Sequence, residues 1–201
     1  MSSSNFVRVF LNSWRVVAVS TLVGLVLAVA FSLVQPLRYS STVRLLITQT
    51  NVTGLDPYTA IKSTERIAQN LSEVIYTSSF FNAVMLDTSI DKNYFPQDEI
   101  NKRKKWRETI LTAVTPGTGV MTVTAYHTVR AQATQLAVRV AQEIANQAPN
   151  YFGYSVRVQI IDDPLPSRFF AKPDFVSNGL MGAVAGFLLS SAWALSRSKE
   201  R

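Results

Sequence analysis

Side chains that could carry out covalent chemistry are few in this chain, and they are scattered. Cysteine is absent, which excludes disulfides, thiolate metal sites and a cysteine nucleophile. The single histidine, His127, lies at a predicted strand-to-helix junction, and no residue can be assigned as the partner that would orient it as a base. Asp162 and Asp163 could form a metal or acid pair, but acids that precede a proline more often end a strand.

The motifs of the large enzyme classes are also missing from the sequence. It contains no G-x-S-x-G nucleophile elbow, no glycine-rich phosphate loop and no H-E-x-x-H zinc motif. We therefore expect no catalytic residue, no cofactor and no metal site, and we expect that the protein is not an enzyme.

One cluster of basic residues combines cations with an aromatic ring and could bind an anionic ligand. The cluster comprises Lys102, Arg103, Lys104, Lys105 and Trp106. Cations beside an aromatic ring can bind an anionic glycan or a lipid-linked pyrophosphate sugar by charge and stacking. The alternative is a solvated helix face whose charge is offset by the neighbouring acids Asp98, Glu99 and Glu108.

Two apolar segments, residues 16–34 and 175–195, contain no charged residue. The 19 residues of the first segment would extend about 28 Å as a helix, close to the thickness of a hydrocarbon core. Both segments are therefore predicted to be transmembrane helices, with residues 35–174 as a domain between them. Cleavage after Ala28-Val29-Ala30 as a signal peptide is the alternative, but the apolar run continues to Val34.

Basic residues flank both apolar segments on the side of the termini. They are Arg8 and Arg15 before the first, and Arg197, Lys199 and Arg201 after the second. The positive-inside rule then places tails 1–15 and 196–201 in the cytoplasm and residues 35–174 outside it. Since these flanks account for part of the net charge of +7, we infer no nucleic-acid partner.

Small residues recur at helical spacing in both predicted spans. They are Ser20, Gly24, Ala28 and Ser32 in the first, and Gly179, Gly182, Gly186 and Ser190 in the second. Small faces let helix backbones approach closely inside a membrane. We expect these faces to pack helices together, within one chain or between subunits; the alternative is that small residues are simply common in spans.

The segment between the spans has the pattern of an α/β (α+β) domain. Strands are predicted at 39–48, 120–126 and 156–160, and helices at 57–76, 80–86, 97–113 and 128–147. Asp56 is the expected cap of the first helix and Ser78 or Ser79 that of the second. The last β-α-β segment could form a crossover unit, so we expect a small mixed sheet covered by helices.

Apolar stripes define the faces of these elements. The first strand alternates Val43, Leu45 and Ile47; the helical stripes are Ile61, Ala68, Leu71 and Ile75, and Val129, Ala133, Leu136, Val140 and Ile144. Residues 163–173 contain Pro164, Pro166 and Pro173. These prolines predict a stiff, extended connector from the last strand to the second span.

The layout resembles that of the bacterial polysaccharide co-polymerases, the chain-length determinants of surface polysaccharides. The matching parts are Tyr39-Ser40-Ser41-Thr42-Val43 after the first span, Ile67-Ala68-Gln69-Asn70-Leu71 with residues 78–84, the strand 121–126 with its alanine-rich helix, and the proline connector. The connector is looser than in the family, with Arg168-Phe169-Phe170 interposed.

The resemblance implies a non-enzymatic scaffold in the bacterial plasma membrane. It would form a ring-like homo-oligomer with a polysaccharide polymerase and lipid-linked glycan as partners, and would set the chain length or export of an O-antigen, capsule or exopolysaccharide. The sequence predicts neither the family's long projecting helix nor a fused kinase, so we expect a short form and a separate kinase if there is one. The alternatives are an adaptor that activates a separate cytoplasmic tyrosine kinase, and an extracytoplasmic ligand-binding transport or sensor module.

Overall fold

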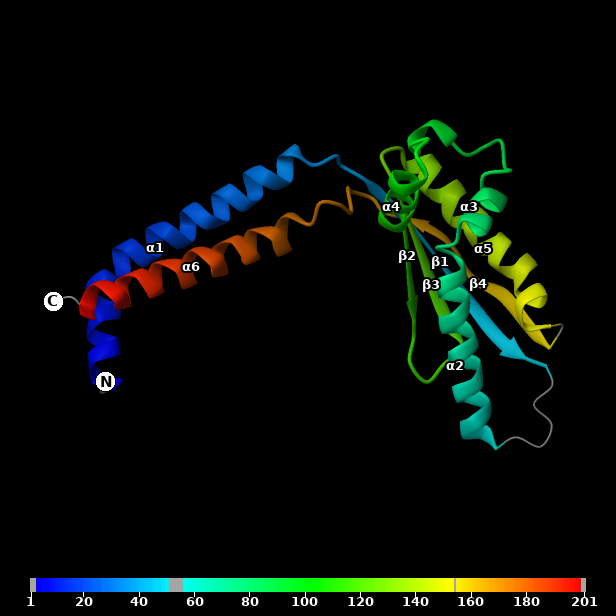
Figure 1. The fold of residues 1–201 in the computed structure, drawn as a ribbon, viewed down its shortest axis with the longest axis horizontal. Coiled ribbons are helices and arrows are strands. Elements are labelled where there is room, and N and C mark those ends of the chain that lie inside the picture. Colours follow the sequence, from blue (N-terminus) through cyan, green and yellow to red (C-terminus); the bar gives the residue numbers. More distant parts are fainter. Residues whose placement is uncertain (1–2, 51–55, 154, 200–201) are drawn as a thin grey trace. The chain divides into compact units, whose positions relative to one another are not determined.

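The structure is a computed structural model that describes residues 3–50, 56–153 and 155–199, with side chains described for 13–50, 56–153, 155–194 and 196–197. The chain divides into two compact units. One unit, the helical pair, consists of Met1–Leu37 and Lys172–Arg201; the other, the central domain, is Arg38–Ala171. Figure 1 shows both units.

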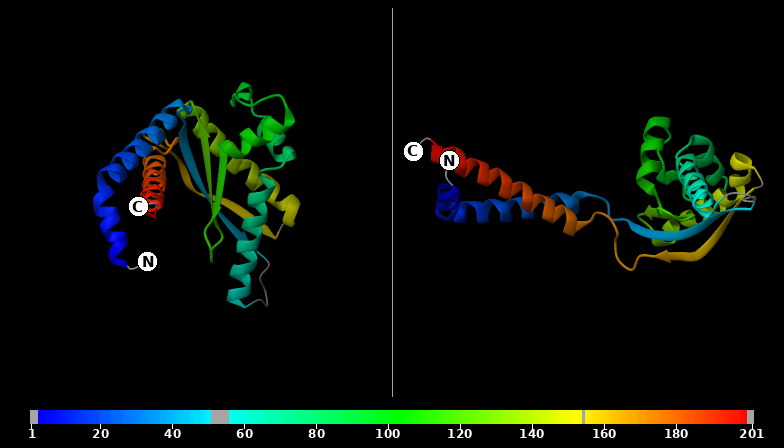
Figure 2. Two further views of the ribbon diagram at one scale, coloured as in Figure 1. Left: turned by 60° about the vertical axis from the view of Figure 1, so that its left-hand side comes forward. Right: turned by 90° about the horizontal axis from the view of Figure 1, so that it is seen from below.

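The helical pair consists of α1 (Ser3–Val34) and α6 (Phe175–Lys199), which run side by side in the views of Figures 1 and 2. Segments Ser13–Val34 and Phe175–Ala194 are long and apolar enough to cross a membrane. Only 11% of each segment is buried, whereas a core helix of a soluble protein would be mostly covered. Both helices therefore expose broad apolar surfaces.

The central domain contains a four-stranded sheet in the order β2-β3-β1-β4. Its strands are β1 (Tyr39–Gln49), β2 (Ile110–Val114), β3 (Val120–His127) and β4 (Val156–Pro166). Every neighbouring pair is antiparallel, so the predicted mixed sheet is wrong. β3 and β4 do run in the same direction and are joined by α5 (Arg130–Phe152), but they cannot pair because β1 lies between them.

The helices of the central domain cover one face of this sheet (Figure 2). They are α2 (Pro57–Val74), α3 (Ser78–Val84), the 3₁₀ turn η1 (Lys92–Tyr94), α4 (Glu99–Thr109) and α5. The predicted alternation in β1 is confirmed, since Val43, Leu45 and Ile47 are all buried in the core. β3 contributes its own alternating set, which includes Met121 and Val123.

The predicted helix starts are partly right. The side chain of Asp56 accepts hydrogen bonds from the backbone N–H groups of Tyr58 and Thr59, as expected for the cap of α2. The cap of α3 is Thr77, not Ser78 or Ser79. Two residues assigned to the core stripes are exposed: Ile61, early in α2, by 47%, and Val129, just before α5, by 53%.

The predicted helix 97–113 is too long. Helix α4 ends at Thr109, and the chain continues directly into β2. Ile110 is fully buried opposite Ala125 of β3. Pairing with β3 therefore outweighs helical propensity at this point, and the β2–β3 turn is closed at Gly117, which has φ +71°.

Strand β4 also differs from the prediction, because it continues past Asp162 and Asp163 to Pro166. It is an edge strand, with β1 as its neighbour in the sheet. Proline is tolerated in an edge strand because one side of the strand makes no ladder hydrogen bonds. Pro164 and Pro166 consequently belong to the sheet and not to a separate connector, and the register against β1 shifts between Thr42 and Leu45.

Candidate functional site

The small residues of α1 and α6 form the contact between these two helices. A Cβ atom on Gly24 would meet the backbone oxygen of Gly182, and one on Gly182 would meet Ala28 Cβ. A Cβ atom on Gly186 would meet the backbone oxygen of Ser20. The structure thus brings Ser20, Gly24 and Ala28 against Gly182 and Gly186 within a single chain, with backbones as close as glycine permits.

Polar side chains lie on the same faces of the two helices. Asn178 Nδ2 donates to Ser32 Oγ at 2.8 Å, and this hydroxyl donates in turn to the backbone oxygen of Ala28 at 3.0 Å. The Ser190 hydroxyl donates to the backbone oxygen of Gly186 at 2.7 Å, within its own helix. Gly179 is less tightly enclosed, since its Cβ would lie 3.3 Å from a methyl of Val29.

Sequence reasoning missed Asn178 as part of this contact. It precedes Gly182 by four residues and so continues the face of Gly182, Gly186 and Ser190. That spacing was the available signal. A hydrogen bond between side chains of neighbouring helices in lipid contributes about 0.6 kcal/mol on average.

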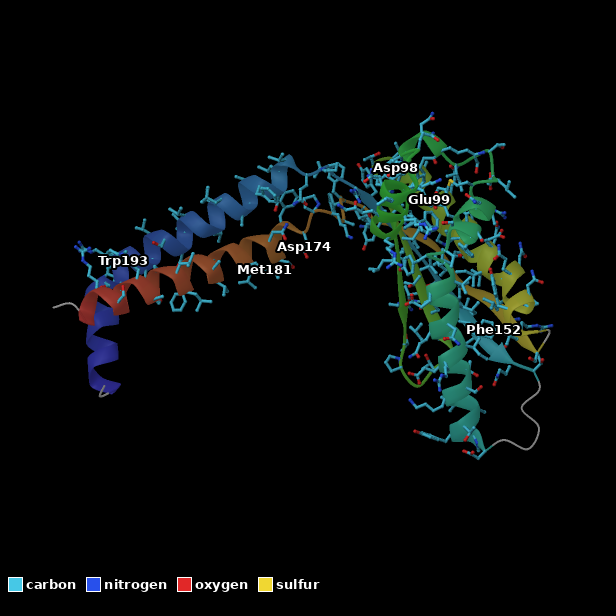
Figure 3. The ribbon with its side chains drawn as sticks, in the orientation of Figure 1. Asp98, Glu99, Phe152, Asp174, Met181 and Trp193 are labelled. Atoms are coloured by element: carbon cyan, nitrogen blue, oxygen red, sulfur yellow. The ribbon has the colours of Figure 1, made fainter. Side chains whose placement is uncertain are left out.

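A cation and a tryptophan lie together toward the terminal end of each helix. The Arg15 guanidinium lies 5.9 Å from the ring of Trp14, and that of Arg197 lies 5.1 Å from the ring of Trp193; Figure 3 labels Trp193. Tryptophan and basic residues are typical of membrane–water boundaries. The remaining predicted flank residues, Arg8, Lys199 and Arg201, fall outside the described side chains.

The segment between β4 and α6 was predicted to belong to a stiff, extended connector, and the structure shows that it pairs with the start of the central domain. The Ser167 N–H donates to the Ser40 oxygen at 2.8 Å, and the Ala171 N–H donates to the Arg38 oxygen at 2.8 Å. The Ser40 N–H donates to Ser167 Oγ at 3.0 Å. The chain therefore enters and leaves the central domain as two hydrogen-bonded strands, and Pro173 follows in the helical pair.

The basic cluster lies on α4, and most of its cations already have partners. Lys102 and Arg103 contact Glu99 at 2.8 and 2.9 Å, and Ser78 Oγ donates to Glu99 at 2.7 Å. These three hydrogen bonds, the one from Lys102 first, lower the pKa of Glu99 to about 2. Glu99 and the helix cap Asp98 are labelled in Figure 3. This side of α4 is thus a solvated face with offset charges.

Two further members of the cluster differ from each other in exposure. Lys105 is half-buried, with its ammonium 4.4 Å from the ring of Tyr94. Lys104 is exposed. The hollow beside Lys102 and Arg103 has a cavity volume of only about 10 Å³, far below the roughly 300 Å³ at which small-molecule pockets begin.

Trp106 cannot stack on a glycan, which corrects its predicted role. Its side chain is only 1% exposed. The indole Nε1–H donates to the backbone oxygen of Ile75 at 2.7 Å, and the ring meets Phe81 edge-on at 5.1 Å. Trp106 therefore fastens α4 to the core and is no part of a binding surface.

His127 has a structural role at the start of α5. It is 4% exposed, its ring packs 4.0 Å from that of Tyr94, and Nδ1 accepts a hydrogen bond from the Val129 N–H at 3.0 Å. Burial lowers the pKa of His127; Asp91 opposes this effect, while Lys105 and Arg38 add to it. The imidazole thus fixes the backbone turn just before α5, and Nδ1 must be unprotonated to accept this hydrogen bond.

The acid pair has no metal-site geometry. Asp162 lies opposite Arg44 in the register of β4 and β1, and both acids are exposed. Among the residues that the structure describes, no group of three metal-ligating side chains comes together.

No protein-family model matches the chain. A search of the curated proteins finds no significant match.

Proposed function

We propose that this chain is a non-enzymatic membrane scaffold of the polysaccharide co-polymerase type, which regulates the chain length or export of a bacterial surface polysaccharide. One observation carries the proposal: two apolar helices, one from each end of the chain, pack on each other through small residues, while the segment between them folds around its own core. This is the layout expected of a domain held at a membrane by its two ends.

The proposed placement is the plasma membrane, with both termini in the cytoplasm and the central domain outside. The pairs Trp14–Arg15 and Trp193–Arg197 support it, because each combines an interfacial aromatic ring with a cation on the terminal side of its helix. Figure 1 shows the start of α1 and the end of α6 at the same end of the helical pair.

The proposed scaffold is a homo-oligomer that acts on the polymerase and its lipid-linked glycan by holding them. Since the faces of Gly24, Gly182 and Gly186 are filled within one chain, copies would meet through the outer sides of the helices or through the central domain. The exposed side of α4, where Lys104 lies, is the proposed glycan contact once Trp106 is excluded.

Deletion of the gene tests the proposal directly. The surface polysaccharide of the deletion strain, separated on a gel, should show an altered length distribution or a reduced amount, and expression of the full chain should restore the original pattern. An unchanged pattern in the deletion strain would refute the proposal. A defect restored only together with a cytoplasmic tyrosine kinase would favour the adaptor.

A further inference from the structure

Three residues loop out of the paired connector. The hydrogen-bonded pairs are Arg38 with Ala171 and Ser40 with Ser167, so a step of two residues on one strand matches a step of four on the other. The three residues between these pairs, 168–170, therefore lie opposite the single residue Tyr39, and we call them the aromatic loop. Its last member, Phe170, folds back on Tyr39 with ring centroids 4.6 Å apart.

The middle residue of the aromatic loop presents a full apolar ring to the surroundings. Phe169 is 82% exposed, more than any other large apolar side chain described in Arg38–Ala171. Burying such a side chain is favourable, and the central domain does not gain this energy from Phe169. Leu165, near the end of β4, is 75% exposed.

Cations accompany these apolar groups. Arg168 is exposed beside Phe169, and Lys172 follows the loop after Ala171. Arg38, on the opposing segment, is half-buried and lies 3.5 Å from Glu108. Apolar rings next to cations are complementary to a lipid surface, where rings enter the headgroup layer and cations meet phosphates.

The covalent chain keeps the aromatic loop close to the spans. Phe169 precedes the first residue of α6, Phe175, by six residues, a distance of at most about 20 Å. The partner segment begins at Arg38, four residues after Val34 at the end of α1, which is at most about 14 Å. Each headgroup layer is about 5–8 Å thick, so both strands of the connector can reach it.

We propose that the aromatic loop is an interfacial anchor: Phe169 enters the headgroup layer of the leaflet from which α1 and α6 emerge, and Arg168 binds lipid phosphates there. This inference rests on the membrane placement in the proposed function and adds the lipid surface as a ligand of the connector. A second copy of the chain would be held at no particular distance from the loop, whereas the membrane is held within reach by both strands.

The absence of cysteine makes the test direct, because single cysteines can be introduced without removing native ones. The full chain is placed in nanodiscs of phosphatidylethanolamine and phosphatidylglycerol, with a nitroxide label at F169C, at L86C or at L27C. Leu86 is 77% exposed in the central domain and serves as the aqueous control; Leu27 is 64% exposed on α1 and serves as the lipid control. Collisions with oxygen and with a nickel chelate are measured for each label.

The expected result is an oxygen-to-nickel accessibility ratio at F169C shifted from the L86C value toward the L27C value. A ratio at F169C equal to that at L86C would overturn the anchor, and so would a label shielded from both reagents, which would indicate a protein contact. The L27C label reports membrane insertion separately, and the polysaccharide gel reports chain-length control. Failure of the anchor is thereby distinguishable from failure of the proposed function.

Discussion

At the scale of single residues, the imidazole of His127 can accept the hydrogen bond from Val129 only while Nδ1 carries no proton. Its ordinary pKa is 6.5, and burial lowers that pKa in the folded chain. Below about pH 6.5 the unfolded chain therefore binds a proton more readily than the folded chain does. The contribution of His127 to stability is complete above that pH and is lost as the pH falls.

We expect the melting temperature of the wild-type chain in detergent to fall between about pH 8 and about pH 5. H127N should lessen this fall, since an asparagine oxygen can accept from the same N–H group and does not titrate. Hydrogen bonds lower the pKa values of carboxyl groups such as Asp87 and Glu99 below their ordinary values of 3.8 and 4.5. These groups therefore titrate below the pH window of this experiment. An equal fall in both proteins would contradict the assignment.

Trp106 offers a second test at a single residue. W106F removes the donor to the Ile75 oxygen and leaves a buried acceptor unpaired. We expect a loss of about 1–3 kcal/mol in the free energy of unfolding, measured by denaturant titration of the full chain. The control is K104Q on the exposed side of the same helix, which should change it by no more than about 0.5 kcal/mol. Equal effects would show that the hydrogen bond of Trp106 does not stabilise the attachment of α4 to the core.

The sequence did contain a signal for the burial of Trp106. Thr109 follows it at helical spacing, the apolar Ile110 comes next, and both are buried with it. The four adjacent cations, residues 102–105, form a stronger pattern in the sequence than these few buried residues do. A functional reading of a charged segment therefore needs the periodicity of its few apolar residues as well.

At the scale of elements, the contact between α1 and α6 is fixed by backbone proximity. G182L would force a side chain into the space held by Gly24 and Ala28. Overpacking of this kind costs about 1–3 kcal/mol, so we expect a lower melting temperature of the helical pair in detergent. The measurement is thermal loss of helical circular dichroism in the full chain.

The matched control for G182L is M181L, the neighbouring residue. Met181 is 72% exposed on α6 and is labelled in Figure 3. A leucine there keeps the apolar surface and should leave the melting temperature unchanged. Equal loss in both variants would mean that Gly182 does not hold the helices together.

The elements that could be predicted from sequence are those with a clear period and clear ends. A clear period of apolar residues is present in β1, β3, α2 and α5, and Asp56-Pro57 marks the start of α2. No glycine or proline separates α4 from β2, so the change from helix to strand after Thr109 left no signal. Alternation assigns a strand's face but not its neighbours, which is why the position of β1 between β3 and β4 required the structure.

At the scale of the whole molecule, the two units have separate sources of stability. The core cluster of the central domain consists entirely of residues within Arg38–Ala171. The helical pair instead relies on close backbone contact and on the hydrogen bond between Asn178 and Ser32. A variant in one unit should therefore leave the other unit folded.

We expect the fragment Arg38–Ala171 to fold without the helical pair, because it carries that complete core together with all four strands. Its thermal unfolding, followed by near-ultraviolet circular dichroism, should be a single cooperative transition, and W106F should lower its midpoint as in the full chain. G182L in the full chain should leave the near-ultraviolet signal of the central domain intact. A fragment without a cooperative transition would show that α1 and α6 are needed for the central domain to fold, so that the chain unfolds as one unit instead of two.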